Sequence, residues 1–317
     1  MRRSLGFGLI LLALSVGVAQ AQEKINYGTA IKFSPVYYLP VLAAQEKGYF
    51  QKNGLDVTWV PSQSGPDMQR DLATGAVQIG SSNAGTDIPA IAKGVPAIIV
   101  ANLQPTDDFA VWVATNSRFQ KPADLKGAKI GVSRLGGAEH AYGRLVARGL
   151  GLEKDIQFVS TGGVRESVAV LTTGGIDGVV LSPNQMMDLM LQGRVKSLVP
   201  LSAYQKKPWL SYTVVANKSF VAKEPGTVKK ILASLWDADR FVLSADGRPW
   251  ALAKLKEVSH YSDAAAERLY ALLNLSTDGK FQKQAVENVV DFMVDYDLLK
   301  KGDVKSVDTL YTDQFVR

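Results

Sequence analysis

The sequence contains no cysteine and only two histidines, His140 and His260. Without cysteine the chain has no disulfide, no thiolate chemistry and no lipid attached through a cysteine behind a leader. Without a pair of histidines at ligand spacing, a transition-metal site is not expected. His140, just inside a predicted helix, is interpreted as a surface or packing residue. We expect neither a metal nor a cofactor.

Dense patches of one charge are also missing. The chain carries 36 Lys and Arg against 30 Asp and Glu, a formal charge of +6. The basic residues are scattered, whereas a nucleic-acid binder gathers them on one face, so nucleic acid is not an expected partner. A mild positive balance is compatible with a small anionic ligand.

Long apolar runs are confined to the first residues. Arg2 and Arg3 precede an apolar run from Leu5 to Val18, which is shorter than the roughly 20 residues of a membrane span. Ala19-Gln20-Ala21 places small residues where a leader is cut. We expect residues 1–21 to be a cleaved export signal and Gln22 the mature N-terminus, which an intact mass would test. An exported chain without disulfides indicates a bacterial periplasm, and a monomer is expected.

Extended and helical segments alternate after the leader. Strands are predicted at residues 25–30, 55–60, 77–81, 97–103, 110–115, 129–133, 156–160, 178–182, 197–201 and 212–216. Helices are predicted at residues 37–47, 65–74, 138–149, 166–173 and 185–192, with several more beyond residue 225. This alternation predicts an α/β fold with mostly parallel sheets.

Part of the sequence is repeated at an offset of 99 residues. Residues 56–60 (DVTWV) align with 155–159 (DIQFV), and residues 72–78 align with 171–177. Upstream, residues 24–25 and 129–130 open comparable strands at an offset of 105, as if the first copy held six extra residues. A chance alignment is the alternative. We interpret the repeat as two similar α/β lobes, one beginning near residue 24 and the other near residue 128.

Loops after the strands of two such lobes would line a cleft, because ligands bind beyond the carboxyl ends of parallel strands. These loops offer hydroxyls, amides, accessible backbone N–H groups and a few aromatic walls, as small-molecule sites do. The candidate ligand-binding residues are Phe33, Ser34, Tyr37, Gln63, Ser64, Gly65, Ser81, Ser82, Asn83, Ser133, Arg134, Gly136, Gly137, Ala138, Ser182 and Asn184.

The segment from Gly131 to Ala138 half-matches two catalytic patterns and completes neither. A P-loop needs Lys and Ser or Thr where Gly137 and Ala138 stand, and a nucleophile elbow needs Gly where Leu135 stands. A strand, a glycine-rich turn and a helix start remain, which suits an anion at the helix N-terminus. Arg134 could add a charge-assisted contact. The alternative places Arg134 on the outer surface, paired with an acid or solvated.

Several short motifs in series resemble a known family. They are Gly48-Tyr49-Phe50 with Gly54-Leu55-Asp56-Val57, Leu72-x-Thr-Gly75-x-Val77, Gly94-Val95-Pro96, and Asp124-Leu125-Lys126-Gly127-x-Lys129-Ile130-Gly131-Val132. Together they are similar to the nitrate/sulfonate/taurine-type solute-binding proteins of ABC importers. The resemblance covers about residues 25–220. Family members often have Asp where Gln78 stands, and the second copy keeps Asp177.

The resemblance implies a type 2 periplasmic-binding fold with two chain crossovers, near residues 114–122 and 212–217. Lobe 1 would comprise residues 22–115 and 216–317, and lobe 2 residues 116–215. Such a protein captures a small organic compound, here a sulfonate- or carboxylate-like anion, by lobe closure and delivers it to a membrane permease. We expect no enzyme activity. The alternatives are an exported enzyme on the same fold, similar to pyrimidine-precursor synthases or menaquinone-pathway enzymes, and a sensor subunit.

Overall fold

The structure, a computed structural model, describes residues 22–104, 106, 108–203 and 208–316; the expected leader, residues 1–21, lies outside them. These residues form ten strands: β1 (Glu23–Thr29), β2 (Leu55–Pro61), β3 (Ile79–Asn83), β4 (Ala97–Gln104), β5 (Ala110–Ala114), β6 (Lys129–Val132), β7 (Gln157–Ser160), β8 (Gly178–Leu181), β9 (Val195–Pro200) and β10 (Tyr212–Asn217). The sequence predicted all ten, with ends within about two residues.

The same residues form helices α1 (Pro35–Glu46), α2 (Tyr49–Lys52), α3 (Gly65–Thr74), α4 (Ala84–Ala92), α5 (Ala138–Gly149), α6 (Val164–Thr172), α7 (Pro183–Leu191), α8 (Lys218–Lys223), α9 (Pro225–Val242), α10 (Arg248–Ser259), α11 (Asp263–Tyr270) and α12 (Lys283–Asp295). The sequence predicted α3 and α5 with these bounds but missed α4. Gly85 and Pro89 lower the helix propensity of α4, and no helix was predicted there. Within the described residues, no helix has the length and apolar character that crossing a membrane requires.

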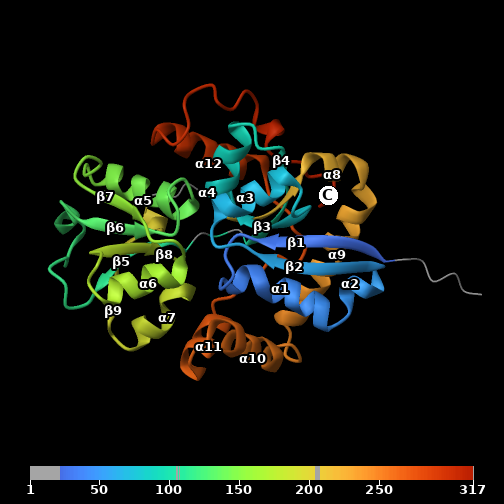
Figure 1. The fold of residues 1–317 in the computed structure, drawn as a ribbon, viewed down its shortest axis with the longest axis horizontal. Helices are drawn as coiled ribbons and strands as arrows, with labels where there is room; N and C mark the ends of the chain where they lie inside the picture. The colour runs from blue at the N-terminus through green and yellow to red at the C-terminus, as the bar shows by residue number, and fades with distance from the viewer. Residues whose placement is uncertain (1–21, 105, 107, 204–207, 317) are drawn as a thin grey trace, which may run out of the picture.

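The strands form two five-stranded sheets that lie side by side as separate lobes (Figure 1). The first lobe has the strand order β2-β1-β3-β10-β4 and the second β7-β6-β8-β5-β9. In each sheet one strand, β10 or β5, runs antiparallel to both of its neighbours. The predicted α/β fold is confirmed, and each sheet is mixed because one strand is reversed.

The two sheets confirm the sequence repeat, since their strand orders correspond one to one. Tyr27 pairs with Trp59 and Ile79 in the first sheet. Phe158 and Gly178, which lie 99 residues after Trp59 and Ile79, both pair with Ile130 in the second sheet. Tyr27 and Ile130 are therefore equivalent at an offset of 103. The predicted offset of 105 for this strand is wrong by two residues, a slip that keeps the same side chains on the same face.

Gln78 and Asp177 have the same role in the two copies. The Gln78 side chain accepts a hydrogen bond from the N–H of Asn26 at 2.9 Å, and the Asp177 carboxylate accepts one from the N–H of Lys129 at 2.8 Å. Each side chain thus satisfies an N–H group of the neighbouring strand. The departure from Asp at position 78 leaves this contact intact, because the amide oxygen replaces a carboxylate oxygen.

Strand pairing differs from the expected lobe boundaries at two strands. β5 (Ala110–Ala114) pairs within the second sheet and β10 (Tyr212–Asn217) within the first. The chain therefore passes between the sheets before these strands, between Gln104 and Ala110 and between Pro200 and Tyr212. The expected crossovers, near residues 114–122 and 212–217, lay one strand too late. The sequence alone did not reveal which sheet each strand joins.

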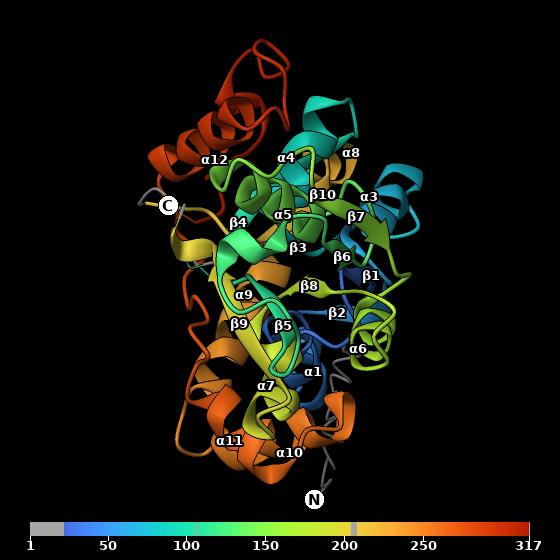
Figure 2. The same ribbon diagram turned by 90° about the vertical axis from the view of Figure 1, so that its left-hand side faces the viewer.

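The C-terminal helices reach the second lobe on two sides. α11 packs on α7 at one side of the molecule, and α12 lies near α4 and α5 at the other (Figures 1 and 2). The Phe292 ring in α12 is 6.4 Å from the Tyr142 ring in α5, and Arg148 of α5 forms an ion pair with Asp297 just beyond α12. The C-terminal segment therefore contacts the second lobe at both edges of the interface between the lobes, which is called the seam below.

Candidate functional site

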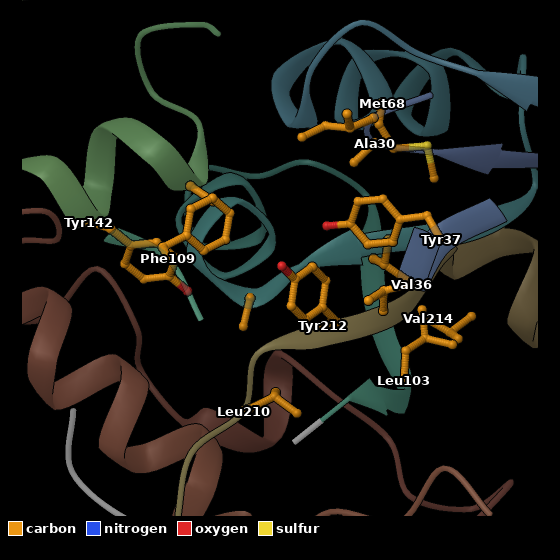
Figure 3. Packing of buried hydrophobic residues seen from close by; sticks show 14 of the residues in the cluster. Ala30, Val36, Tyr37, Met68, Leu103, Phe109, Tyr142, Leu210, Tyr212 and Val214 are labelled. Atoms are coloured by element: carbon orange, nitrogen blue, oxygen red, sulfur yellow. The ribbon is translucent and has the colours of Figure 1, made fainter. Parts of the chain in front are cut away.

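Four aromatic side chains gather where the lobes meet. Tyr37 lies in α1, Tyr212 begins β10, Phe109 precedes β5, and Tyr142 lies in α5 (Figure 3). The Tyr37 and Tyr212 rings are 5.4 Å apart, edge to face, and Phe109 lies 5.3 Å from Tyr142 and 6.5 Å from Tyr212. All four are nearly buried. Rings from both lobes and both crossovers thus form one aromatic cluster.

Asn83 connects this cluster to the end of β3. It is both the last residue of β3 and the N-cap of α4, where its Oδ1 accepts from the N–H of Gly85 at 2.8 Å. The same oxygen accepts from the Tyr142 hydroxyl at 2.9 Å, a hydrogen bond between the lobes. Its Nδ2 is buried and has no partner among the described residues. A buried donor without an acceptor is costly, which indicates a group that a ligand could satisfy.

Two hydroxyl groups from the predicted loops are also buried without a hydrogen-bond partner among the described residues. Ser34 precedes α1 and Ser133 follows β6, and both are buried. Within the described part of the chain neither Oγ has a hydrogen-bond partner. Each lobe therefore contributes a buried polar atom at the carboxyl end of a strand equivalent in the repeat, β1 and β6. These atoms are of the kind that orients a small molecule.

Other predicted residues already have partners within their own lobe. Ser81 shares a 2.7 Å hydrogen bond with Tyr27. Ser64 donates to Asp67 at 2.6 Å and caps α3, whose first residue Gly65 packs closely on Thr86. These residues position the loops around the seam. Their side chains are held by the protein itself.

Ser182 and Asn184 lie at the start of α7. Ser182 donates to the Asn184 side chain at 2.7 Å, and the Asn184 carbonyl accepts a hydrogen bond from Tyr261 of the first lobe's C-terminal segment. Gln63 and Phe33 also face the second lobe. The Gln63 side chain lies beside Gly163, and the Phe33 ring is covered by Arg165. The structure thus brings Asn184, Gln63 and Phe33 to the seam.

The buried carboxyl of Asp87 lies just beneath Asn83, in the first turn of α4. It accepts from Gln69 at 2.6 Å and from the hydroxyl of Thr213. Burial raises its pKa to about 7, although the neighbouring polar groups of Ser82, Thr213 and Gln69 act in the opposite direction. Among the predicted residues, Ser82 therefore lies beside this carboxyl, while its Oγ has no hydrogen-bond partner among the described residues. The contacts tie α3, α4 and β10 together behind the site.

The turn from Ser133 to Ala138 has fewer free backbone N–H groups than the sequence indicated. Gly136 has φ of +84° and its N–H donates to His140 Nδ1 at 3.0 Å, while the Gly137 N–H donates to the Arg134 carbonyl at 3.3 Å. Glu139, next to Ala138, is buried with its carboxylate over Gly137. A carboxyl group of the protein thus occupies the start of α5, where the helix dipole would otherwise favour an external anion.

Arg134 is half-exposed and forms a 3.5 Å ion pair with Asp67 of the first lobe. We predict that Arg134→Ala lowers the free energy of unfolding by less than about 1 kcal/mol, because exposed ion pairs contribute little. Urea denaturation of both proteins measures it. A larger loss, or an affinity for the ligand reduced more than about tenfold, would instead indicate that Arg134 binds an anion.

Three of the four aromatic residues were not predicted from the sequence. Tyr142 sits in the middle of a helix, and Phe109 and Tyr212 flank the crossovers, so their meeting depends on how the lobes are arranged. Only the helical spacing of Ala138 and Tyr142 could have placed Tyr142 on the same face as the predicted turn. In the described residues no group of three or more Asp, Glu and His could hold a metal ion.

Comparison with proteins of known sequence gives a relative that is named as an enzyme. The 4-amino-5-hydroxymethyl-2-methylpyrimidine phosphate synthase THI13 of Saccharomyces cerevisiae is 25% identical over 227 residues, 68% of this chain and 66% of the yeast protein. Further relatives carry the same enzyme name. These relatives contradict the expectation that the chain is not an enzyme. That expectation rested on the expected export signal, the absence of cysteine and the scarcity of histidine.

Solved structures share the fold. The alkanesulfonate-binding protein SsuA from Xanthomonas axonopodis, bound to MOPS, aligns with a TM-score of 0.75 and 21% identity over 93% of this chain and 99% of its own. The periplasmic nitrate-binding protein NrtA from Synechocystis aligns with a TM-score of 0.72 and 14% identity over 93% and 87%. The type 2 periplasmic-binding fold implied by the sequence motifs is confirmed.

A protein family defined by sequence matches residues 36–244, from α1 to just beyond α9. The matched segment contains both sheets from β2 onward, both crossovers and all four residues of the aromatic cluster. It therefore covers the seam that the geometry marks as the site. The chain belongs to the NMT1/THI5-like family.

Proposed function

We propose that the chain binds a small, flat nitrogen heterocycle of the aminopyrimidine kind at the seam between its lobes. The observation that carries this proposal is the aromatic cluster of Tyr37, Phe109, Tyr142 and Tyr212, which comes from both lobes and both crossovers. Aromatic faces favour stacking with a planar ring. The name of the yeast relative supplies the chemical class.

The polar atoms around the cluster support the same class of ligand. Asn83 Nδ2 can donate to a ring nitrogen, and the hydroxyls of Ser34 and Ser133 can donate or accept. The carboxyl group of buried Glu139 occupies the start of α5, where a small anion would otherwise bind. A neutral ring that carries N–H donors suits these groups better than the sulfonate- or carboxylate-like anion expected from the sequence.

In the proposed role the protein acts in the periplasm and delivers its ligand to the permease of an ABC importer. Lobe closure on the ligand would present both lobes together to that partner. The support is the fold shared with periplasmic sulfonate- and nitrate-binding proteins and the expected export signal. Isolation of the protein from the periplasmic fraction, with Gln22 at its N-terminus, would test the location.

A second candidate is a pyrimidine phosphate synthase, which the names of the relatives favour. The two functions differ in turnover. Added to a cell extract, a synthase would raise the pyrimidine phosphate with time, far beyond one molecule per protein. A carrier would bind no more than one equivalent. Mass spectrometry of the extract distinguishes these outcomes.

We predict that 4-amino-5-hydroxymethyl-2-methylpyrimidine binds and that Phe109→Leu weakens it about fivefold to a hundredfold. Leu nearly conserves volume but removes a stacking face worth about 1–3 kcal/mol. Isothermal titration calorimetry measures both affinities. Phe220→Leu in α8, half-buried and far from the seam, is the matched control and should bind like the wild type. Equal affinities for the Phe109 variant and the wild type would contradict the proposed site.

A further inference from the structure

A separate cavity of about 210 Å³ is lined by residues of both lobes. Its lining comes from α6, α7 and the end of α10, helices whose places in the fold Figure 2 shows. The first lobe and its C-terminal segment contribute Phe33, Ser259 and Tyr261. The second lobe contributes apolar walls from two helices: Val164, Val168, Met186 and Leu189. Because both lobes form it, the cavity exists only while they are together. Its size suits one small molecule with an apolar body.

Arg165, the second residue of α6, is the basic group of this cavity. Its guanidinium lies 3.6 Å from the centre of the Phe33 ring, a cation–π contact across the seam. No carboxylate of the described residues lies within ion-pair distance of it. The N–H groups of a guanidinium lie in its own plane, so contact of its face with the ring leaves its edge able to meet a carboxylate in a bidentate pair.

Two acidic residues lie close to Arg165, and both are turned to other groups. Asp188 in α7 lines the cavity, and its carboxylate accepts hydrogen bonds from the N–H and the hydroxyl of Ser262. Glu166 places its carboxylate against Gly163, at the start of α6. Tyr261, between Arg165 and Asp188, donates its hydroxyl to the Asn184 carbonyl. Arg165 therefore remains the cation available to a ligand.

We propose that this cavity is a second binding site, for a small carboxylic acid with an apolar aryl or alkyl group. Arg165 binds the carboxylate, and the walls from α6 and α7 cover the apolar part. The cavity shares no lining residue with the aromatic cluster, and the proposal does not depend on the ligand proposed for that cluster. Since its walls come from both lobes, its occupation favours the closed form.

The test uses a matched pair of probes, 3-phenylpropionate and 3-phenylpropan-1-ol, titrated into the full protein by calorimetry. The wild type is expected to bind the acid about tenfold or more tightly than the alcohol, as a charge-assisted pair provides. Arg165→Gln should abolish this preference while the affinity for the alcohol stays within about twofold. Arg134→Gln, a control arginine at the same seam, should leave the preference intact.

Val168→Trp, which fills the cavity, should abolish binding of both probes and leave binding of the aminopyrimidine unchanged. The proposal is overturned if the wild type shows no preference for the acid, if Arg165→Gln keeps that preference, or if Val168→Trp still binds the acid. Failure of the aminopyrimidine to bind the wild type would count against the aromatic site alone. Circular dichroism establishes that each variant is folded before titration.

Discussion

Asp239→Asn is expected to stabilise the protein above neutral pH by an amount on the order of 1–3 kcal/mol. Asp239 lies in α9 and is completely buried, and neither carboxylate oxygen has a hydrogen-bond partner among the described residues. Burial raises its pKa well above the ordinary value, and the neighbouring charge of Arg240 offsets only part of this. An ionised carboxylate without partners is costly in a protein interior. The amide keeps the shape and removes the charge.

The raised pKa also sets the direction of the pH dependence. Between the unfolded pKa, near 3.8, and the raised folded pKa, the folded protein holds a proton that the unfolded chain has lost. The stability from this group is complete below about pH 3.8 and is lost as pH rises through the folded pKa. Asp87, with a pKa of about 7, adds a loss of the same sign between about pH 4 and pH 7.

Urea denaturation from pH 5 to pH 9 measures the effect. The difference in free energy of unfolding between Asp239→Asn and the wild type should grow as pH rises, because only the wild type has a carboxyl group that stays protonated in the folded state and ionises on unfolding. Asp246→Asn, at an exposed position, is the control for removing a negative charge and should change stability by less than about 0.5 kcal/mol. A difference that is constant with pH would mean that the folded pKa of Asp239 is not raised into or above this range.

Local sequence patterns were sufficient to predict the strands and most helices of both lobes. The alternation in residues 55–60 and the glycines that end α3 and α6 are local patterns of a few residues. They can be recognised in a single copy of the repeat, and each occurs again in the other copy. The family motifs then implied the fold. α4 was missed because Asn83 ends β3 and caps the helix at once, leaving no loop between the two elements.

The candidate site could be predicted only in part, because it is assembled by contacts between distant segments. Ser34, Asn83 and Ser133 were predicted since each follows a strand, and strand ends share one edge of a sheet. Phe109 and Tyr212 reach the site through the two crossovers, whose positions the sequence did not reveal. Glu139 was also overlooked, and its carboxyl group occupies the start of α5 beside the predicted anion site. Contacts between segments this far apart in the sequence depend on the tertiary structure.

Gly80→Ala is expected to lower the free energy of unfolding by about 3 kcal/mol, at the upper end of the usual cost of overpacking. A Cβ at Gly80 in β3 would lie 2.2 Å from the carbonyl oxygen of Gly28 in β1 and 2.4 Å from Met68 Cε of α3. The methionine can move, but the carbonyl belongs to the neighbouring strand, so β1 and β3 must separate. Gly226→Ala, exposed with no atom within 4 Å, is the control and should be neutral or slightly stabilising.

The same substitution connects the core to the site. Gly80 immediately precedes Ser81, and β3 ends three residues later at Asn83, whose amide bonds to Tyr142 of the other lobe. Separation of β1 from β3 would shift this amide and the Ser34 hydroxyl that follows β1. We therefore expect Gly80→Ala to weaken aminopyrimidine binding as well, by about tenfold if one hydrogen bond is lost. Denaturation and calorimetry on the same sample measure both effects. If Gly80→Ala is as stable as the wild type, the sheet accommodates the methyl group. If stability falls but affinity does not, ligand binding does not depend on the spacing of β1 and β3.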